Sequence, residues 1–172
     1  SIQACSVEEV NEVMTVANEN RECWEEKTHR ERAEILMNAA NIMKQWANSL
    51  GFIMMKEIGK PLNSAVSEIT RTAEYFEATA EAGLQQEGEA IFGDTFKGFN
   101  REKMSITYKV PLGVIVCIGP FNYPFNLTGS KIAPALMAGN TVVVKPPSQG
   151  AITPLFFGLI LEKAGVPPGV FN

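Results

Sequence analysis

The segment Gly119–Ser148, GPFNYPFNLTGSKIAPALMAGNTVVVKPPS, has the means to do chemistry although it holds no histidine, cysteine or acidic residue. Asn122 stands out because it falls between an apolar run and a helical pattern, in a stretch whose prolines restrict the backbone. Its amide donates hydrogen bonds and does not titrate. Position alone favours a plainer role for Asn122, as an Asx-turn or as a cap on the helix that follows.

A second set of polar residues, Lys145-Pro-Pro-Ser148-Gln149, follows a fully apolar run. Nucleotide-binding β-α-β units commonly place an acid at this point to accept hydrogen bonds from the adenosine ribose. Here a lysine and a serine stand instead, and no carboxylate is present to repel a 2′-phosphate. We therefore expect NADP as cofactor, with NAD also possible. Position alone leaves open a solvated lysine at a strand end.

The other reactive side chains match no catalytic arrangement. His29, the only histidine, falls in the first turn of an expected helix and is predicted to be solvated. Cys117 lies within an apolar run and is predicted to be a small buried hydrophobe. Cys5 and Cys23 are isolated, and without CxxC spacing no disulfide framework or metal site is expected.

Composition bounds the class of protein. The chain has 172 residues, 45% hydrophobic, with a net charge of −4 and a pI near 5.1. Basic residues do not cluster, so no nucleic-acid surface is expected. Apolar runs are too short to span a bilayer, and the first residues lack the pattern of a signal peptide. The isolated cysteines fit a reducing compartment, so a cytoplasmic location is expected.

Two kinds of predicted secondary structure position these residues, helices in the first half of the chain and alternating strands and helices in the second. Residues 1 to about 90 are expected to be helical, with capping boxes at Ser6–Glu9 and Thr28–Glu31 and a third helix beginning at Pro61. Apolar residues three and four apart predict one buried face per helix. These stripes are Val7, Val10, Met14 and Ala17; Leu36, Ala40, Met43, Ala47 and Leu50; and Val66, Ile69, Ala73, Phe76, Ala80 and Leu84. Residues 88–100 look like a linker.

From Met104 the period changes. Residues 104–110 alternate apolar and polar, which predicts a half-buried strand in an antiparallel pair or ribbon. GVIVCIG and TVVVK are apolar throughout, as strands covered on both faces should be. Helices are expected over about 125–137 and 153–163, ending near Gly139 and Gly165, and GVFN begins a third strand. The order β-α-β-α-β predicts a parallel sheet.

The predicted fold is therefore α/β, with N-terminal helices and the first part of a Rossmann-like parallel sheet. G-x-G-x-x-G is absent, so an ordinary diphosphate turn is not expected. We expect three parts: residues 1–100 as the helical part of a cofactor domain, 101–112 as a ribbon strand and 113–172 as the start of the nucleotide-binding sheet. Because three helical stripes need more sheet than this, we expect the front part of a larger protein.

The stretch VPLGVIVCIGPFNYPFNLTGSKIAPALMAGNTVVVKPPSQ, followed by AGVPPGVFN, resembles the aldehyde dehydrogenase superfamily. The resemblance implies the fold of that family and oxidation of an aldehyde to a carboxylic acid with NAD(P)⁺. It implies that the Asn122 side chain is an oxyanion donor, that Lys145 bonds the adenosine ribose and that Ser148 accommodates the 2′-phosphate. It also implies a cofactor cleft lined by Ile118, Gly119, Pro120 and Phe121.

Within the superfamily, FNYPFNLTGSKIAPAL, KPPSQG and RTAEYFEATAEAGLQQEGE most resemble the non-phosphorylating, NADP-dependent glyceraldehyde-3-phosphate dehydrogenases. That subgroup binds the substrate phosphate through an arginine and a tyrosine, which correspond to Arg71 and Tyr123. An arginine suits phosphate because its planar fork donates two parallel hydrogen bonds. By periodicity alone Arg71 is a solvated residue off the apolar stripe, with Glu68 three residues earlier as a partner.

The resemblance also shapes what the chain is expected to do by itself. The family's nucleophilic cysteine and general-base glutamate have no match here, so the isolated chain is expected to be inactive. The strand from Met104 resembles part of the family's oligomerisation ribbon, which implies a homodimer or homotetramer. Two alternatives stay open: an aldehyde dehydrogenase for an unphosphorylated aldehyde such as lactaldehyde or a semialdehyde, and a non-catalytic nucleotide-binding fragment.

Overall fold

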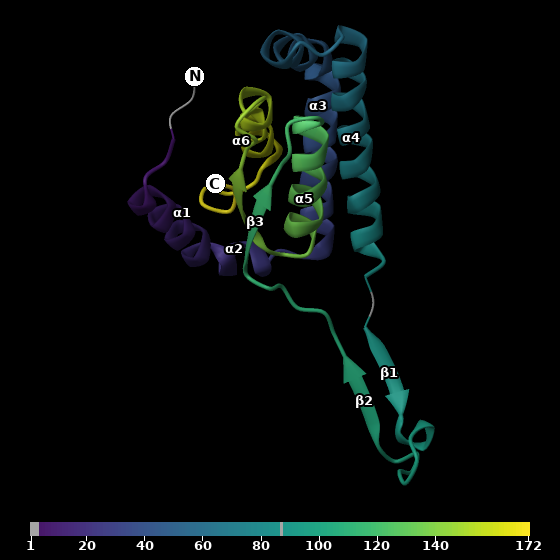
Figure 1. Cartoon of the computed structure of the whole chain (residues 1–172). Helices are drawn as coiled ribbons and strands as arrows, with labels where there is room; N and C mark the ends of the chain where they lie inside the picture. The colour runs from purple at the N-terminus through teal and green to yellow at the C-terminus, as the bar shows by residue number, and fades with distance from the viewer. Residues whose placement is uncertain (1–3, 87) are drawn as a thin grey trace.

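The computed structural model describes residues 4–86 and 88–172 (Figure 1). Its elements are α1 (Val7–Glu19), α2 (Arg21–Glu25), α3 (His29–Ile58), α4 (Leu62–Leu84), β1 (Glu89–Phe92), the 3₁₀ turn η1 (Gly93–Thr95), β2 (Met104–Thr107), β3 (Val114–Ile118), α5 (Pro124–Met137), β4 (Thr141–Lys145) and α6 (Ile152–Ala164). The expected helices and strands occur in the expected order, and α2, β1 and η1 are added to them.

The long helices α3 and α4 lie side by side as one layer, and in Figure 1 α3 passes behind α5 while α4 stands beside it. Both predicted capping boxes are present, at Ser6–Glu9 and Thr28–Glu31. The predicted stripe of α3 is buried along its whole length. The stripe of α4 is buried from Ile69 to Ala80, whereas Leu84, the last residue of the helix, is exposed. These faces enclose one continuous hydrophobic core.

The predicted stripe of α1 is largely wrong. Val7 and Val10 are 71% and 48% exposed, and only Ala17 of the four is buried. The spacing identified the helix correctly, but within the described residues only Ala17, near the C-terminal end of α1, is buried, so the apolar face of the first turns is left uncovered there.

Strands β3 and β4 pair in parallel, from Val114 opposite Thr141 to Ile118 opposite Lys145, with α5 as the crossover. Phe171 bridges Val142 in the same direction, so the beginning of a third parallel strand is confirmed. The expectation that both faces of β3 are covered is wrong within the described residues. Cys117 is fully buried, but Val116 and Ile118 on the opposite face are 51% and 57% exposed. An apolar run does not reveal which face a neighbouring element covers.

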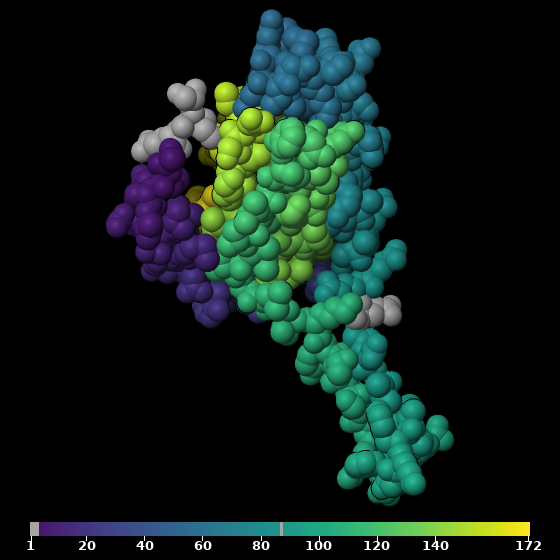
Figure 2. Space-filling model, viewed as in Figure 1, coloured from purple at the N-terminus to yellow at the C-terminus, as the bar shows by residue number. Residues whose placement is uncertain are grey.

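Strands β1 and β2 form an antiparallel hairpin that extends from the body as an arm (Figure 2). The antiparallel ribbon was predicted, but the linker expected at 88–100 instead contains β1 and η1. The expectation of a half-buried strand is wrong for β2, because all four of its residues are exposed. A two-stranded hairpin has no second layer of its own to cover either face.

Candidate functional site

The loop that joins β3 to α5 carries Asn122 and Tyr123 at the carboxyl end of the sheet. It leaves the sheet through Gly119, whose N–H donates to the Lys145 carbonyl at 3.4 Å. A side chain at Gly119 would collide with the hydroxyl of Thr128 on α5, so the loop can pass this close to the helix only with glycine there.

The first turn of α5 is capped by a residue from another helix. Tyr123, at the N-cap position, makes no side-chain capping bond. Instead Glu68 Oε1, from α4, accepts the backbone N–H groups of Phe125 and Asn126, each at 3.0 Å. Glu68 is only 3% exposed. Position alone favoured Asn122 as the cap of this helix, but in the structure the cap is a buried carboxylate that lies 57 residues before Phe125.

Lys60 links this carboxylate to the Asn122 loop. Its Nζ lies 2.5 Å from Glu68 Oε2 and donates to the backbone carbonyl of Asn122 at 3.3 Å. It also lies 3.8 Å from the centre of the Tyr123 ring, a cation–π contact. The ion partner suggested for Arg71, Glu68, is thus engaged with Lys60. Among the described residues, no hydrogen bond uses the side-chain amide of Asn122, which is exposed.

A pocket of about 320 Å³ opens beside this cluster, and it brings the two predicted substrate residues together. Arg71 from α4 and Tyr123 from the loop line it, with Lys60 between α3 and α4. The remaining lining residues are polar: Asn63, Ser64, Ser67, Glu68 and Asn126. Because the Glu68 charge is already compensated by Lys60 and two N–H groups, the pocket presents hydrogen-bond donors and one further cation to an anionic group.

The predicted cofactor residues meet on the other side of the loop. A cavity of about 320 Å³ is lined by five of the six, Gly119, Pro120, Phe121, Lys145 and Ser148, together with Pro147 and Gln149. The sixth, Ile118, pairs with Lys145 in the sheet but does not line this cavity. No acid is among these lining residues, so the ammonium of Lys145 and the hydroxyl of Ser148 fit a ribose or a 2′-phosphate.

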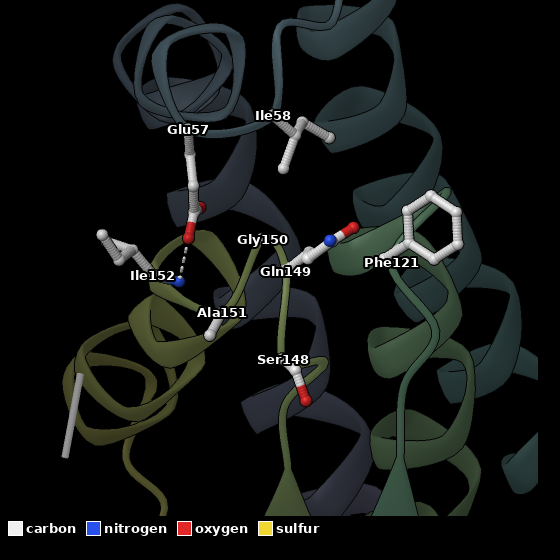
Figure 3. Close-up of a pocket in the computed structure, with 8 residues that line it drawn as sticks. All are labelled: Glu57, Ile58, Phe121, Ser148, Gln149, Gly150, Ala151 and Ile152. Carbon is white, nitrogen blue, oxygen red and sulfur yellow. Dashed lines mark hydrogen bonds between the residues drawn. The ribbon is translucent and has the colours of Figure 1, made fainter. Parts of the chain in front are cut away.

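An adjoining cavity of about 580 Å³ lies between the end of α3 and the start of α6 (Figure 3). It shares Phe121, Ser148 and Gln149 with the first cavity and adds Glu57. The Glu57 carboxylate accepts the N–H of Ile152 at 2.7 Å and both the N–H and the hydroxyl of Thr153, at 3.1 and 3.0 Å. Figure 3 shows this carboxylate pointing at the first turn of α6.

Both helices that follow the parallel strands therefore begin on a glutamate carboxylate, α5 on Glu68 and α6 on Glu57. The N-terminus of such a helix is where an ordinary Rossmann unit holds a diphosphate. Here those amides already donate to a carboxylate, so they are not free to bind a diphosphate. This agrees with the absence of G-x-G-x-x-G and leaves the strand ends as the groups offered to a nucleotide.

The remaining reactive side chains lie where the sequence placed them, and none joins the site. Burial raises the pKa of the Cys117 thiol to about 11, so it is almost entirely protonated at neutral pH and is a poor nucleophile. Cys5, Cys23 and His29 are exposed. Within residues 4–86 and 88–172, no cluster of three or more His, Cys, Asp or Glu side chains could hold a metal ion. The same residues include no helix long and apolar enough to cross a membrane.

Sequence reasoning missed Lys60, Glu68 as a cap, and Glu57. For Glu68 a signal existed. It lies three residues after buried Ala65 and directly before buried Ile69, so the spacing places a charge on the buried face of α4. A buried charge requires partners, and those partners are the loop and Lys60. For Lys60 and Glu57, at or beyond the last turn of α3, no comparable signal exists.

Parallel strands joined by a crossover helix, with helices packed against them, define an α/β fold. The chain belongs to the aldehyde dehydrogenase family, which it matches over residues 1–172. The resemblance seen in the sequence is thereby confirmed, and so is the predicted fold.

Among curated relatives, the NADP-dependent glyceraldehyde-3-phosphate dehydrogenase of Streptococcus equinus is 44% identical over 172 residues, all of this chain and 36% of the relative. The NADP-dependent succinate-semialdehyde dehydrogenase of Escherichia coli is 38% identical, over all of this chain and 35% of its own length. The chain thus spans about a third of the length of the curated relatives it matches.

Among solved structures, the NADP-dependent glyceraldehyde-3-phosphate dehydrogenase of Bacillus halodurans C-125, complexed with NADP, superposes with a TM-score of 0.95. It is 39% identical, and the match covers 99% of this chain and 36% of that one. The chain is therefore similar in sequence and in structure to NADP-dependent enzymes of the family.

Proposed function

We propose that this chain works within a longer NADP-dependent aldehyde dehydrogenase, called the complete enzyme below, that oxidises glyceraldehyde 3-phosphate to 3-phosphoglycerate. The observation that carries the proposal is the placement of one loop between two pockets. On one side of Asn122 lie Lys145 and Ser148, and on the other lie Arg71 and Tyr123. A cofactor and a phosphorylated substrate could thus meet at Asn122.

In the proposed reaction, the rest of the complete enzyme supplies a cysteine thiolate and a carboxylate base. The thiolate adds to the aldehyde carbon, and the carbonyl oxygen becomes an oxyanion. NADP⁺, when bound, accepts the hydride that leaves this carbon, and water activated by the base then hydrolyses the thioester to the acid. Aldehyde, NADP⁺ and water thereby become acid, NADPH and a proton.

The part of this chain is to stabilise the oxyanion through the Asn122 side-chain N–H. The amide suits this task because it donates at every pH and, among the described residues, is engaged in no other hydrogen bond. Cys117 is not the nucleophile, because its raised pKa and burial keep it protonated.

The cofactor part of the proposal is NADP, with NAD as a weaker substitute. Lys145 and Ser148 provide donors for the ribose and the 2′-phosphate, and Gly119, Pro120 and Phe121 form the wall beside them. One acid, Glu57, lines the adjoining cavity, and its carboxylate oxygens already accept bonds from α6. The similarity to several NADP-dependent enzymes supports the same choice.

The substrate part is tested through Arg71. In the complete enzyme, Arg71→Ala is expected to lower kcat/KM for glyceraldehyde 3-phosphate by about 10- to 100-fold, the worth of a charge-assisted bond to phosphate. The rate with unphosphorylated glyceraldehyde should change little. Arg30→Ala, at an exposed position on α3, is the matched control.

An equal fall in kcat/KM for both aldehydes would show that Arg71 does not recognise the phosphate. It would favour the alternative, an unphosphorylated substrate such as a semialdehyde. The similarity to a succinate-semialdehyde dehydrogenase keeps that alternative open. A complete enzyme that binds NADP but oxidises no aldehyde would favour a purely nucleotide-binding role.

The proposal includes assembly into a homodimer or homotetramer through the β1–β2 hairpin. Phe92, Met104 and Ile106 are each about half exposed along this arm, an apolar surface suited to a second copy. The division into a helical part, a ribbon and a sheet follows the same proposal, as does a cytoplasmic location, which the free cysteines support. Light scattering of the complete enzyme should give the mass of two or four chains, and a stable monomer would contradict this.

A further inference from the structure

We infer that Glu68 and Lys60 are positioning residues for the reaction: they hold the backbone of Asn122 so that its side-chain amide points at the oxyanion. The inference rests on the proposed role of Asn122 and adds two residues that act through it.

Glu68 holds the chain just after Asn122. One carboxylate oxygen accepts both Phe125 N–H and Asn126 N–H, and the Asn126 side chain donates to Thr72, one turn further along α4. The start of α5 is thereby fixed to α4 at three points within two residues. Because Asn122 lies only three residues before Phe125, its backbone has little freedom left on this side.

Lys60 holds Asn122 itself. Its ammonium donates to the Asn122 carbonyl at 3.3 Å, lies over the ring of Tyr123 and is anchored by the second oxygen of Glu68. The side chain of Lys60 is 13% exposed and that of Glu68 is 1% exposed, so water screens the pair weakly. A cation bonded to the Asn122 carbonyl leaves the side-chain amide of that residue free to serve a ligand.

This arrangement is stronger than a helix cap requires. A Ser, Asp or Asn at the N-cap, local to the loop, satisfies first-turn N–H groups in most helices. Here a buried ion pair does so from another helix, at a desolvation cost that a mere cap does not demand. What the ion pair adds is the bond from Lys60 to the Asn122 carbonyl, and that bond bears on the reaction.

A double-mutant cycle in the complete enzyme tests the inference. Lys60→Gln, Asn122→Ala and the double variant are compared by single-turnover formation of NADPH, expressed per active site by the burst amplitude. Lys60→Gln is expected to slow hydride transfer by about 10- to 100-fold, as a small misplacement of a catalytic group does. KM for the aldehyde and Kd for NADP should stay within about 2-fold, since the lost interaction is made in the transition state.

In the Asn122→Ala background, adding Lys60→Gln should lower the rate per active site by less than about 2-fold, because the side chain that Lys60 positions is already absent. Lys60→Arg, which keeps a cation, should recover most of the rate. A merely structural role would lower the fraction of active sites and leave the rate per site unchanged. If Lys60→Gln does not fold, Glu68→Gln enters the same cycle with the same expectation.

Three results would overturn the inference: a Lys60→Gln rate per site equal to the wild type, a full loss repeated in the Asn122→Ala background, or a loss confined to the phosphorylated aldehyde. The last would make Lys60 a phosphate ligand. The proposed function fails differently, through an Asn122→Ala variant that transfers hydride at the wild-type rate.

Discussion

Helices α5 and α6 both follow a parallel strand and both begin on a glutamate from the α3–α4 layer, but the two glutamates have different surroundings. Glu68, under α5, is buried and paired with Lys60, which in turn bonds the Asn122 carbonyl. Glu57, under α6, is partly buried, makes no ion pair among the described residues and lines a cavity of about 580 Å³. The loop before α5 is held by this hydrogen-bond and ion-pair network, whereas the loop before α6 borders the cavity.

This difference matches the tasks proposed for the two loops. A donor to an oxyanion must keep its geometry to a fraction of an ångström, because its worth depends on being in place before charge develops. A loop that binds the adenosine half of a cofactor can adjust to its ligand at little cost in rate. The ion pair therefore lies beside the loop proposed to stabilise the oxyanion, and the cavity lies beside the loop proposed to bind the cofactor.

The largest effect should separate the two glutamates. Glu68→Ala leaves Lys60 without its counter-ion and two N–H groups without acceptors, so we expect a loss of about 3–5 kcal/mol in local stability. Glu57→Ala removes only a cap, for which about 1–2 kcal/mol is expected. Hydrogen exchange of the complete enzyme, read by mass spectrometry over 122–128 and 151–155, measures both. Equal acceleration in the two peptides would remove the distinction between the helices.

The next effect concerns the open side. Ser148→Glu places a carboxylate in the cofactor cavity, where it would repel a 2′-phosphate and offer an acceptor to an unmodified ribose. We expect kcat/KM for NADP to fall by about 10- to 100-fold and that for NAD to fall much less, on the scale of one charge-assisted hydrogen bond. Gln45→Glu, exposed on α3, controls for the added charge. Parallel losses for both cofactors would place the 2′-phosphate elsewhere.

The smallest effect is at a local cap, the Thr28–Glu31 box at the start of α3. Thr28→Ala should destabilise the chain by about 1 kcal/mol. The bonds from Thr28 lower the pKa of Glu31, so its contribution is present above the ordinary carboxyl pKa and is lost as pH falls through the folded-state pKa. The difference in the free energy of unfolding between Thr28→Ala and the wild type, measured by urea titration, should therefore become smaller at acid pH. A difference that becomes larger there would contradict the assignment.

These caps also explain how much of the fold the sequence could predict. The boxes at Ser6–Glu9 and Thr28–Glu31 were predicted because both partners lie within one helical turn. The cap of α5, Glu68, lies 57 positions before Phe125, and the cap of α6, Glu57, lies 95 positions before Ile152. No local sequence pattern contains both a helix start and a cap so far away. The parallel strands were predicted from their apolar runs. The exposure of Val116 and Ile118 was not, because coverage of a face depends on elements that periodicity does not describe.

The candidate site divides in the same way. Lys145 and Ser148 were predicted from the residues alone, because a strand end that has donors and no carboxylate does not repel a 2′-phosphate. Asn122, Arg71 and Tyr123 needed the family resemblance, since an isolated amide or arginine has many ordinary roles. Lys60, Glu68 and Glu57 gain their roles only from tertiary contacts, and of these only Glu68 stood on a buried face where its charge called for partners.

The most direct test of the account is hydride transfer by Asn122→Ala in the complete enzyme, with Asn38→Ala, exposed on α3, as the matched control. Loss of one oxyanion donor should slow single-turnover NADPH formation by about 10²–10³-fold. Kd for NADP should change less than about 2-fold, because Asn122 is not among the lining residues of the cofactor cavity. A rate equal to that of Asn38→Ala, or weaker NADP binding in place of a slower rate, would contradict the account. In it, the loop before α5 stabilises the oxyanion and the loop before α6 binds the cofactor.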